Sequence, residues 1–183
     1  MKLERYITQP YLESQRLLHA RPEGYGGRGD KWADVVAGLM VDHNCPLVLD
    51  YGCGQGTLAS AIRAKSLGEV SEYDPAIPGK DNIEKWKTFD LVVCTDVLEH
   101  VEPDRLPVVI DHLFKLTKKI LFLVIATRPS NKFFPDGRNV HLTIQPASWW
   151  RERLDHPSFE EIESPKSPLS QISRELVVVL VRK

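Results

Sequence analysis

One run of residues has the types and spacing needed to hold a ligand against the main chain: Asp50, Gly52, Gly54 and Gly56. The apolar residues Leu47–Leu49 precede it and are typical of a strand buried on both faces. The residues that follow have the spacing and composition of a helix. Glycines are needed in such a turn because its backbone angles disfavour a Cβ atom and because the ligand must approach closely. The run therefore predicts a strand, a tight turn and a helix N-terminus that cradle a ligand.

A further carboxylate follows at Asp74, eighteen residues after Gly56, at the end of a second predicted strand. Two adjacent ribose hydroxyls can both donate to one carboxylate, so an acidic residue at this place suits a nucleoside ligand. A dinucleotide fingerprint would need a third glycine at position 57, which is Thr57 here. We therefore expect a nucleoside ligand that is not held through a pyrophosphate.

Two segments resemble motifs of the class I S-adenosylmethionine (SAM) dependent methyltransferases. The glycine run resembles the first motif of that superfamily, and FDLVVCTDVLEHV, residues 89–101, resembles its fourth-strand motif. The two motifs stand in the family's order with Asp74 between them, and the resemblance covers roughly residues 45–128. It implies an α/β Rossmann-like three-layer sandwich, with a mostly parallel sheet and an antiparallel C-terminal strand pair.

The resemblance also implies SAM as the cofactor and a set of contacts to it. In this family the turn backs onto the methionine part of SAM, and the acidic residue after the second strand binds the ribose. The residues expected to bind the cofactor are Tyr25, Arg28, Asp50, Gly52, Cys53, Gly54, Gln55, Gly56, Asp74, Thr95 and Asp96.

The first 29 residues precede the clear elements of the fold. We expect residues 1–29 to cover the cofactor and residues 30–183 to form the methyltransferase domain. Within the glycine-rich stretch ARPEGYGGRG, Tyr25 and Arg28 are the residues able to hold a carboxylate.

The segment between Asp74 and the 89–101 strand departs from the family pattern. The family has a helix, a third strand and an adenine-contacting acidic residue there, whereas PAIPGKDNIEKWKT is too short for all three. The sheet is therefore expected to be trimmed at this edge. Asp81, Asn82 and Trp86 are candidates for the adenine contact, and a plain surface loop is the alternative.

Methyl transfer from a sulfonium needs the acceptor held in line with the methyl carbon, and a general base where the acceptor is a hydroxyl or a protonated nitrogen. His141 lies in a long loop beyond the apolar strand 118–127, at the edge where α/β enzymes hold substrates. His141 and Asp96 are therefore the candidate catalytic residues. The acceptor is expected to be a hydroxyl or amine of a small molecule, a sugar or a metabolite.

A metal-assisted alternative stays open. Asp96, Glu99 and His100 stand at i, i+3 and i+4, so a helix would bring them to one face, and His141 would complete a ligand set for a divalent cation. The pattern is similar to the acidic-x-x-Glu-His site of plant small-RNA 2′-O-methyltransferases and of ubiquinone-pathway O-methyltransferases. The same LEHV string is also common in methyltransferases that use no metal, and there the histidine packs at the helix start.

The length and charge of the chain limit the number of domains, the partners and the compartments that it can have. The chain has 183 residues, enough for one domain, and its 24 basic and 25 acidic residues give a net charge of −1. This balance does not indicate a nucleic acid as partner and does not exclude one. Three cysteines and no apolar signal or membrane-spanning segment favour a cytoplasmic protein without a membrane partner. A nicotinamide-dependent oxidoreductase and a catalytically silent module that binds SAM or a partner are the rival interpretations.

Overall fold

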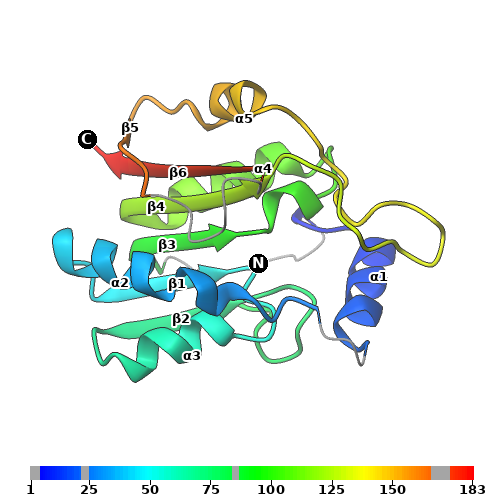
Figure 1. Ribbon diagram of the computed structural model, residues 1–183, viewed down its shortest axis with the longest axis horizontal. Helices are drawn as coiled ribbons and strands as arrows, with labels where there is room; N and C mark the ends of the chain where they lie inside the picture. The colour runs from blue at the N-terminus through cyan, green and yellow to red at the C-terminus, as the bar shows by residue number, and fades with distance from the viewer. Residues whose placement is uncertain (1–4, 22–24, 84–86, 166–173) are drawn as a thin grey trace.

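A single mixed sheet forms the centre of the molecule (Figure 1). The computed structural model describes residues 5–21, 25–83, 87–165 and 174–183. Within them the strand order is β2-β1-β3-β4-β6-β5. The strands are β1 (Leu47–Tyr51), β2 (Glu69–Tyr73), β3 (Phe89–Thr95), β4 (Thr117–Ala126), β5 (Phe159–Ile162) and β6 (Glu175–Arg182). Strands β1 to β4 are parallel, and β6 runs antiparallel to both β4 and β5. The predicted fold class is confirmed.

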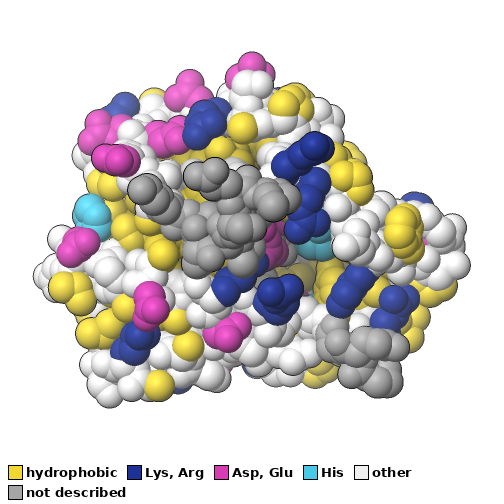
Figure 2. All heavy atoms as spheres, in the orientation of Figure 1, with side chains coloured by type: hydrophobic (Ala, Val, Ile, Leu, Met, Phe, Trp, Pro, Cys, Tyr) yellow, Lys and Arg dark blue, Asp and Glu magenta, His cyan; other side chains and the backbone are white. Residues whose placement is uncertain are grey.

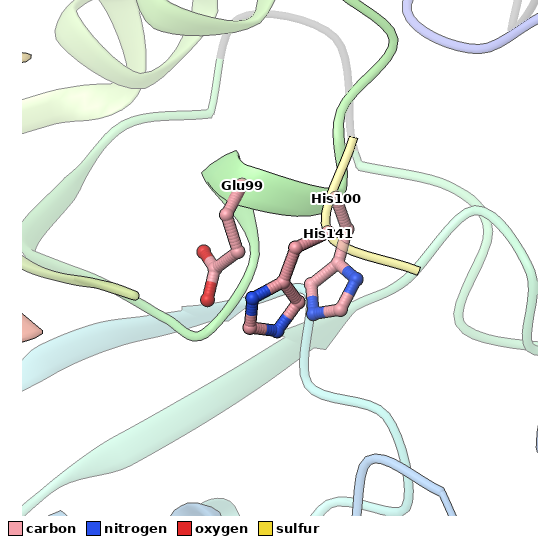
Figure 3. A group of neighbouring side chains, drawn as sticks. All are labelled: Glu99, His100 and His141. Carbon is pink, nitrogen blue, oxygen red and sulfur yellow. The ribbon is translucent and has the colours of Figure 1, made fainter. Parts of the chain in front are cut away.

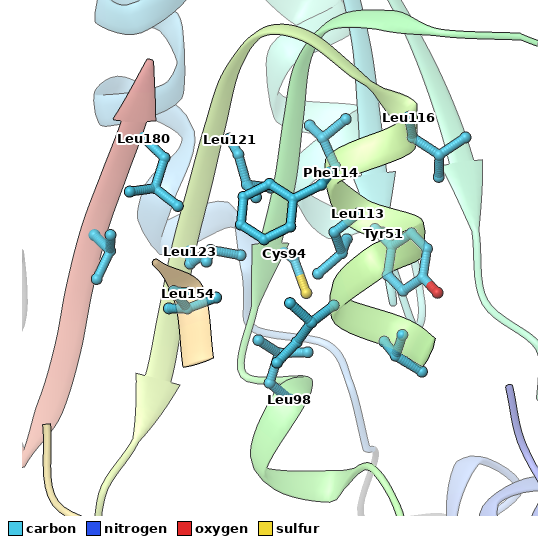
Figure 4. Packing of buried hydrophobic residues seen from close by; sticks show 14 of the residues in the cluster. Tyr51, Cys94, Leu98, Leu113, Phe114, Leu116, Leu121, Leu123, Leu154 and Leu180 are labelled. Carbon is cyan, nitrogen blue, oxygen red and sulfur yellow. The ribbon is translucent and has the colours of Figure 1, made fainter. Parts of the chain in front are cut away.

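Apolar residues on successive strand positions fill two cores, one on each face of the sheet. In β3, Leu91 and Val93 face a layer made of η2 (Gly29–Trp32), α2 (Ala33–Asp42) and α3 (Thr57–Ala64). The intervening Val92 and Cys94 face α4 (Leu106–Leu116) and α5 (Ala147–Leu154), the core drawn in Figure 4. Because successive side chains of a strand point to opposite faces, an all-apolar strand must be covered on both. The result is the expected sandwich of three layers.

The sheet is short at the β2 edge. Residues 74–83 and 87–88 contain no strand or helix, so β2 is the last strand on that side among the described residues. The expected trimming of the third-strand region is therefore present in the part of the chain that is described. Trp86 lies outside the described residues.

A third apolar cluster joins the N-terminal helix to the loops at the carboxyl ends of the strands. Helix α1 (Gln9–His19) and the loop that contains Phe134 lie side by side there (Figure 1). Tyr11 packs edge-on against Phe134, and its hydroxyl donates to the carbonyl of His100. His100 ends the short 3₁₀ helix η3 (Leu98–His100). These contacts fix α1 over the edge of the sheet where polar residues gather.

The glycine turn after β1 is needed for packing within the protein itself. Gly52, Gly54 and Gly56 have φ angles of +76°, +50° and +77°, which L side chains rarely adopt. A Cβ on Gly54 would lie 2.4 Å from the carbonyl oxygen of Gly26, and one on Gly52 would lie 2.3 Å from a methyl of Val97. The turn therefore closes directly against the N-terminal segment and the loop after β3.

None of the helices in the described residues has the length and apolar character that a bilayer-spanning helix requires.

Replacing Gly54 by alanine is expected to destabilise the fold more than the same change at Gly137. Both residues have positive φ angles, but a Cβ on Gly137 would meet no atom within 4 Å. Gly137→Ala should cost about 1–2 kcal/mol for the strained backbone alone. Gly54→Ala should cost about 1–3 kcal/mol more, because the backbone of Gly26 must move. Urea unfolding of both variants measures the difference, and equal losses would contradict the close approach.

Candidate functional site

A cavity of about 390 Å³ opens at the carboxyl ends of β1 to β4. It is lined by the glycine turn and the ends of the strands, by the N-terminal segment and by the loop after β4. Most of the residues predicted to act on a cofactor or acceptor line this cavity: Tyr25, Arg28, Asp50, Gly52, Cys53, Gly54, Asp74, Thr95, Asp96 and His141. Residues from five separate parts of the chain therefore converge at the predicted edge.

Two predicted cofactor residues are not on the cavity wall. The Gln55 side chain donates to the carbonyl of Tyr25 over 3.1 Å, and Gly56 caps the N-terminus of α3. A Cβ on Gly56 would lie 2.1 Å from a carboxylate oxygen of Glu72, so its glycine is explained by packing. The adenine candidates Asp81 and Asn82 do not line the cavity either.

The two carboxylates on the cofactor side are held in different ways. Asp74 accepts backbone hydrogen bonds from Gly54 at 3.0 Å and from Ala76 at 2.9 Å, which fixes its position at the turn. Asp50 is only 4% exposed, and its Oδ2 has no hydrogen-bond partner among the described residues. Burial, together with the charge of Glu72, raises the pKa of Asp50 to about 7. A buried carboxylate oxygen without a partner on a cavity wall is suited to a hydrogen-bond donor on a ligand.

The N-terminal segment reaches the cavity through its contact with the glycine turn. The carbonyl of Gly26 accepts a hydrogen bond from the amide of Gln55 at 3.0 Å. Tyr25 precedes this contact, and its hydroxyl oxygen lies 3.1 Å from Nδ1 of His100. Arg28 follows the contact, lines the cavity and is exposed to solvent. The described part of residues 1–29 thus contributes to the lining of the cavity, and its role as a cover for a cofactor stays a prediction.

A group of two imidazoles and a carboxylate lies beside the cavity (Figure 3). Potential ligand atoms of Glu99, His100 and His141 all lie within 4.8 Å of one another. The two imidazole rings meet edge to face, with their centroids 4.7 Å apart. η3, which follows β3, and the loop that follows β4 therefore bring these three predicted residues together.

Hydrogen bonds fix the tautomer of both imidazoles. Nδ1 of His141 lies 2.6 Å from the carbonyl of Arg128, and Nδ1 of His100 lies 2.7 Å from the carbonyl of Val140. A carbonyl oxygen only accepts, so both Nδ1 atoms carry the hydrogen and both Nε2 atoms keep a lone pair. Burial, with the charge of His141 as a second cause, lowers the pKa of His100 to about 4, and burial also lowers the pKa of His141. Both rings are thus neutral at pH 7, with Nε2 able to accept a proton or bind a metal.

Glu99 is completely buried, and only one of its two carboxylate oxygens accepts a hydrogen bond from the described residues. Its Oε1 accepts a hydrogen bond from the amide of Ala126 at 3.1 Å, whereas its Oε2 has no hydrogen-bond partner within the part of the chain that the structure describes. Burial, with the nearby Asp96 as a second cause, raises the pKa of Glu99 to about 8. Two imidazole nitrogens and an oxygen without a partner are a donor set that fits a divalent cation.

Asp96 does not belong to this group. The predicted spacing assumed an α-helix from Asp96 onward, but the backbone of Asp96 is left-handed, with φ +55°, and η3 begins only at Leu98. The carboxylate of Asp96 instead forms an ion pair with Lys31, with Nζ and Oδ2 2.7 Å apart. Lys31 is a residue of the site that the sequence analysis missed. No motif distinguishes it from other surface lysines in the sequence.

An aromatic wall of the cavity was not predicted from the sequence. Tyr6, Tyr51 and Tyr73 line the cavity, and His112 lies against all three rings. The hydroxyl of Tyr73 is buried and has no hydrogen-bond partner among the described residues. Tyr51 and Tyr73 end their strands next to the predicted site residues, which was the available signal in the sequence.

Comparison with known proteins adds the family. Residues 26–167 match the methyltransferase domain family. The chain belongs to the class I SAM-dependent methyltransferases. The predicted resemblance is thereby confirmed.

Two curated relatives of this methyltransferase are O-methyltransferases by name. It is 31% identical over 117 residues to the magnesium-protoporphyrin O-methyltransferase of Synechocystis. The aligned region covers 51% of each chain. It is 30% identical over 113 residues to the mitochondrial ubiquinone biosynthesis O-methyltransferase of Schizosaccharomyces pombe. That aligned region covers 48% of this chain and 39% of the relative. The methyltransferase thus spans about half the length, or less, of these two relatives.

A solved structure shows the same fold over nearly all of this chain. It is the magnesium protoporphyrin IX methyltransferase of Synechocystis PCC 6803 with bound S-adenosylhomocysteine, at 18% identity and a TM-score of 0.62. The alignment covers 99% of this chain and 98% of that one.

The two imidazoles are expected to remain neutral and protonated on Nδ1 at pH 7 in protein freed of divalent cations. The carbonyl of Arg128 and the carbonyl of Val140 each fix one ring. Long-range ¹H–¹⁵N spectra distinguish the two tautomers directly. On acidification, His100 should remain neutral until the pH approaches about 4. A rotating or Nε2-protonated ring at His141 would contradict this arrangement.

Proposed function

We propose that this protein transfers the methyl group of SAM to a hydroxyl oxygen of a small-molecule acceptor, with an amine as the alternative acceptor atom. One observation carries the proposal. Two neutral imidazoles, those of His100 and His141, line the cavity, and each keeps an Nε2 lone pair. The relatives named O-methyltransferases support an oxygen acceptor, and the solved relative with bound S-adenosylhomocysteine supports SAM as cofactor.

The cofactor is proposed to bind along the glycine turn. Asp74, held by the turn amides, accepts from the ribose hydroxyls, and the free oxygen of Asp50 accepts from the methionine ammonium. Arg28, exposed at the mouth of the cavity, is placed to bind the methionine carboxylate. Tyr25, Thr95 and Asp96 complete the proposed cofactor contacts.

His141 is proposed as the general base for the acceptor. Its Nδ1–H is anchored on the carbonyl of Arg128, so its Nε2 can take the proton that the hydroxyl loses as the oxygen attacks the methyl carbon. The hydrogen bond to Arg128 also holds the ring in one orientation, which favours an in-line approach. Glu99, fully buried, does not reach the cavity wall itself.

A metal-assisted mechanism is the second candidate, and the unsatisfied Oε2 of Glu99 favours it. A divalent cation held by Glu99, His100 and His141 would give this oxygen a partner and lower the pKa of an acceptor hydroxyl. The Nδ1–H groups of both histidines already donate to carbonyls, the orientation that metal-binding histidines use. Asp96, in its ion pair with Lys31, stands outside this proposed ligand set.

Helix α1 is proposed to exclude water from the reaction. It is fixed over the cavity by the bond from Tyr11 to the carbonyl of His100 and by Thr8, which donates twice to Glu102. Residues 1–29 would then act as a cover for cofactor and acceptor. We also propose that the enzyme acts in the cytoplasm, as its free cysteines suggest.

Removing the Asp74 carboxylate is expected to weaken SAM binding. Asp74→Ala should cost about 1–3 kcal/mol of binding free energy, because the ribose hydroxyls lose their acceptor. The same change at Asp42, an exposed residue of α2 off the cavity wall, is the matched control and should leave the affinity unchanged. Isothermal titration with SAM, S-adenosylhomocysteine and NAD measures this. Tight binding of NAD in place of SAM would overturn the proposed function.

The base and the metal mechanisms predict different responses to a chelator. For a base, transfer of labelled methyl to a metabolite pool should persist in chelator, and kcat/KM should rise with pH through a pKa below 6.5, because burial favours the neutral ring. His141→Ala should lower that rate by about 10²- to 10⁴-fold. For a metal site, chelation should abolish turnover, added divalent cation should restore it, and SAM affinity should change little. Full activity of His141→Ala would exclude both mechanisms.

A further inference from the structure

Three basic side chains line the cavity, those of Arg28, Arg128 and Lys132. Lys31 lies beside it in its ion pair with Asp96. Figure 2 shows Lys and Arg side chains around the middle of the face that it draws, with a histidine visible among them. These cations can bind an anionic group only where the acidic lining residues do not already pair with them.

Two of the acidic residues that line the cavity have partners other than Arg128. Asp96 is paired with Lys31 at 2.7 Å, and Glu102 accepts from the amide and the hydroxyl of Thr8 at 2.9 and 2.6 Å. Among the described residues, neither carboxylate forms an ion pair with Arg128.

Arg128 combines a fixed backbone with an uncommitted guanidinium. Its carbonyl anchors the Nδ1–H of His141 at 2.6 Å, so the residue stands next to the proposed base. Its guanidinium donates to the carbonyl of Pro129 at 3.3 Å, and among the described residues no carboxylate is within ion-pair distance of it. A half-buried guanidinium at a cavity wall, with most of its N–H groups unused, is suited to bind two oxygens of a carboxylate or a phosphate.

Lys132 contributes a second positive charge to the same wall. It follows Arg128 in the loop after β4, and its ammonium lies 5.1 Å from the centre of the Tyr25 ring. Tyr25 in turn contacts His100, and His100 contacts His141, whose Nδ1–H donates to the Arg128 carbonyl, so the Lys132 ammonium and the two imidazoles belong to one connected wall.

We propose that the acceptor carries an anionic group, a carboxylate or a phosphate, which Arg128 and Lys132 bind while the acceptor oxygen faces His141. This proposal rests on the proposed function and assigns it a substrate class. Arg28 is left for the methionine carboxylate of SAM, so each anionic group has a basic partner of its own.

Three phenols that differ in charge test this proposal on protein saturated with S-adenosylhomocysteine. They are 4-hydroxybenzoate, (4-hydroxyphenyl)phosphonate and the neutral 4-hydroxybenzamide, each titrated by calorimetry. At least one anionic phenol should bind ten times or more tightly than the amide, and the stronger of the two identifies the preferred oxyanion. Arg128→Gln should abolish the preference. Arg16→Gln, the same change at an exposed residue of α1 off the cavity wall, should preserve it.

Equal binding of the three phenols, no binding of either anion, or a preference that survives Arg128→Gln would overturn the proposal. In the labelled-methyl assay, the acceptor should be retained when the metabolite pool is passed over an anion exchanger at pH 8. An acceptor that flows through would also overturn it. A pool that yields no labelled product contradicts the proposed function, whereas the phenol titrations test the anionic subsite separately.

Discussion

The contact between Gly54 and Gly26 is the constraint on which the arrangement of the site depends. Here two backbones approach so closely that a Cβ on Gly54 would lie 2.4 Å from the carbonyl oxygen of Gly26. The contact fixes the N-terminal segment against the end of β1, with Tyr25 on one side of it and Arg28 on the other. Through Tyr25 it also reaches His100. One steric requirement thus connects the cofactor side of the cavity to the acceptor side.

The acceptor side is organised by backbone carbonyls as much as by side chains. The carbonyls of Arg128 and Val140 orient two imidazoles, and the amide of Ala126 holds one oxygen of Glu99. Side chains positioned in this way lose little further freedom when a ligand binds, which is the physical basis of preorganisation. The amides of Leu142 and Thr143 donate to the carbonyl of Glu99 and join the two loops that carry the group.

Much of the architecture could be predicted from the sequence because local signals determined it. The apolar strands and the glycine turn reflect burial on both faces and positive φ angles, which the residue types report directly. The grouping of Glu99, His100 and His141 followed from their positions after β3 and β4. Asp96 stands apart from that group, and the sequence could not show this, because its left-handed backbone and its pairing with Lys31 depend on tertiary contacts. The contacts of Gln55 and Gly56 within the protein could not be predicted either, since both residues contact neighbours that are distant in sequence.

The trimmed sheet leaves β2 with an open edge, a place where another chain could add a strand and start aggregation. Glu69 and Tyr73 bond to β1, so the carbonyl of Val70 between them points outward along that edge. Arg63 of α3 donates to this carbonyl at 2.7 Å, and the same guanidinium pairs with Glu72 of β2. A charged side chain thereby occupies the acceptor that an incoming strand would need. The shortened sheet remains protected against edge-to-edge association by a residue that has no part in the site.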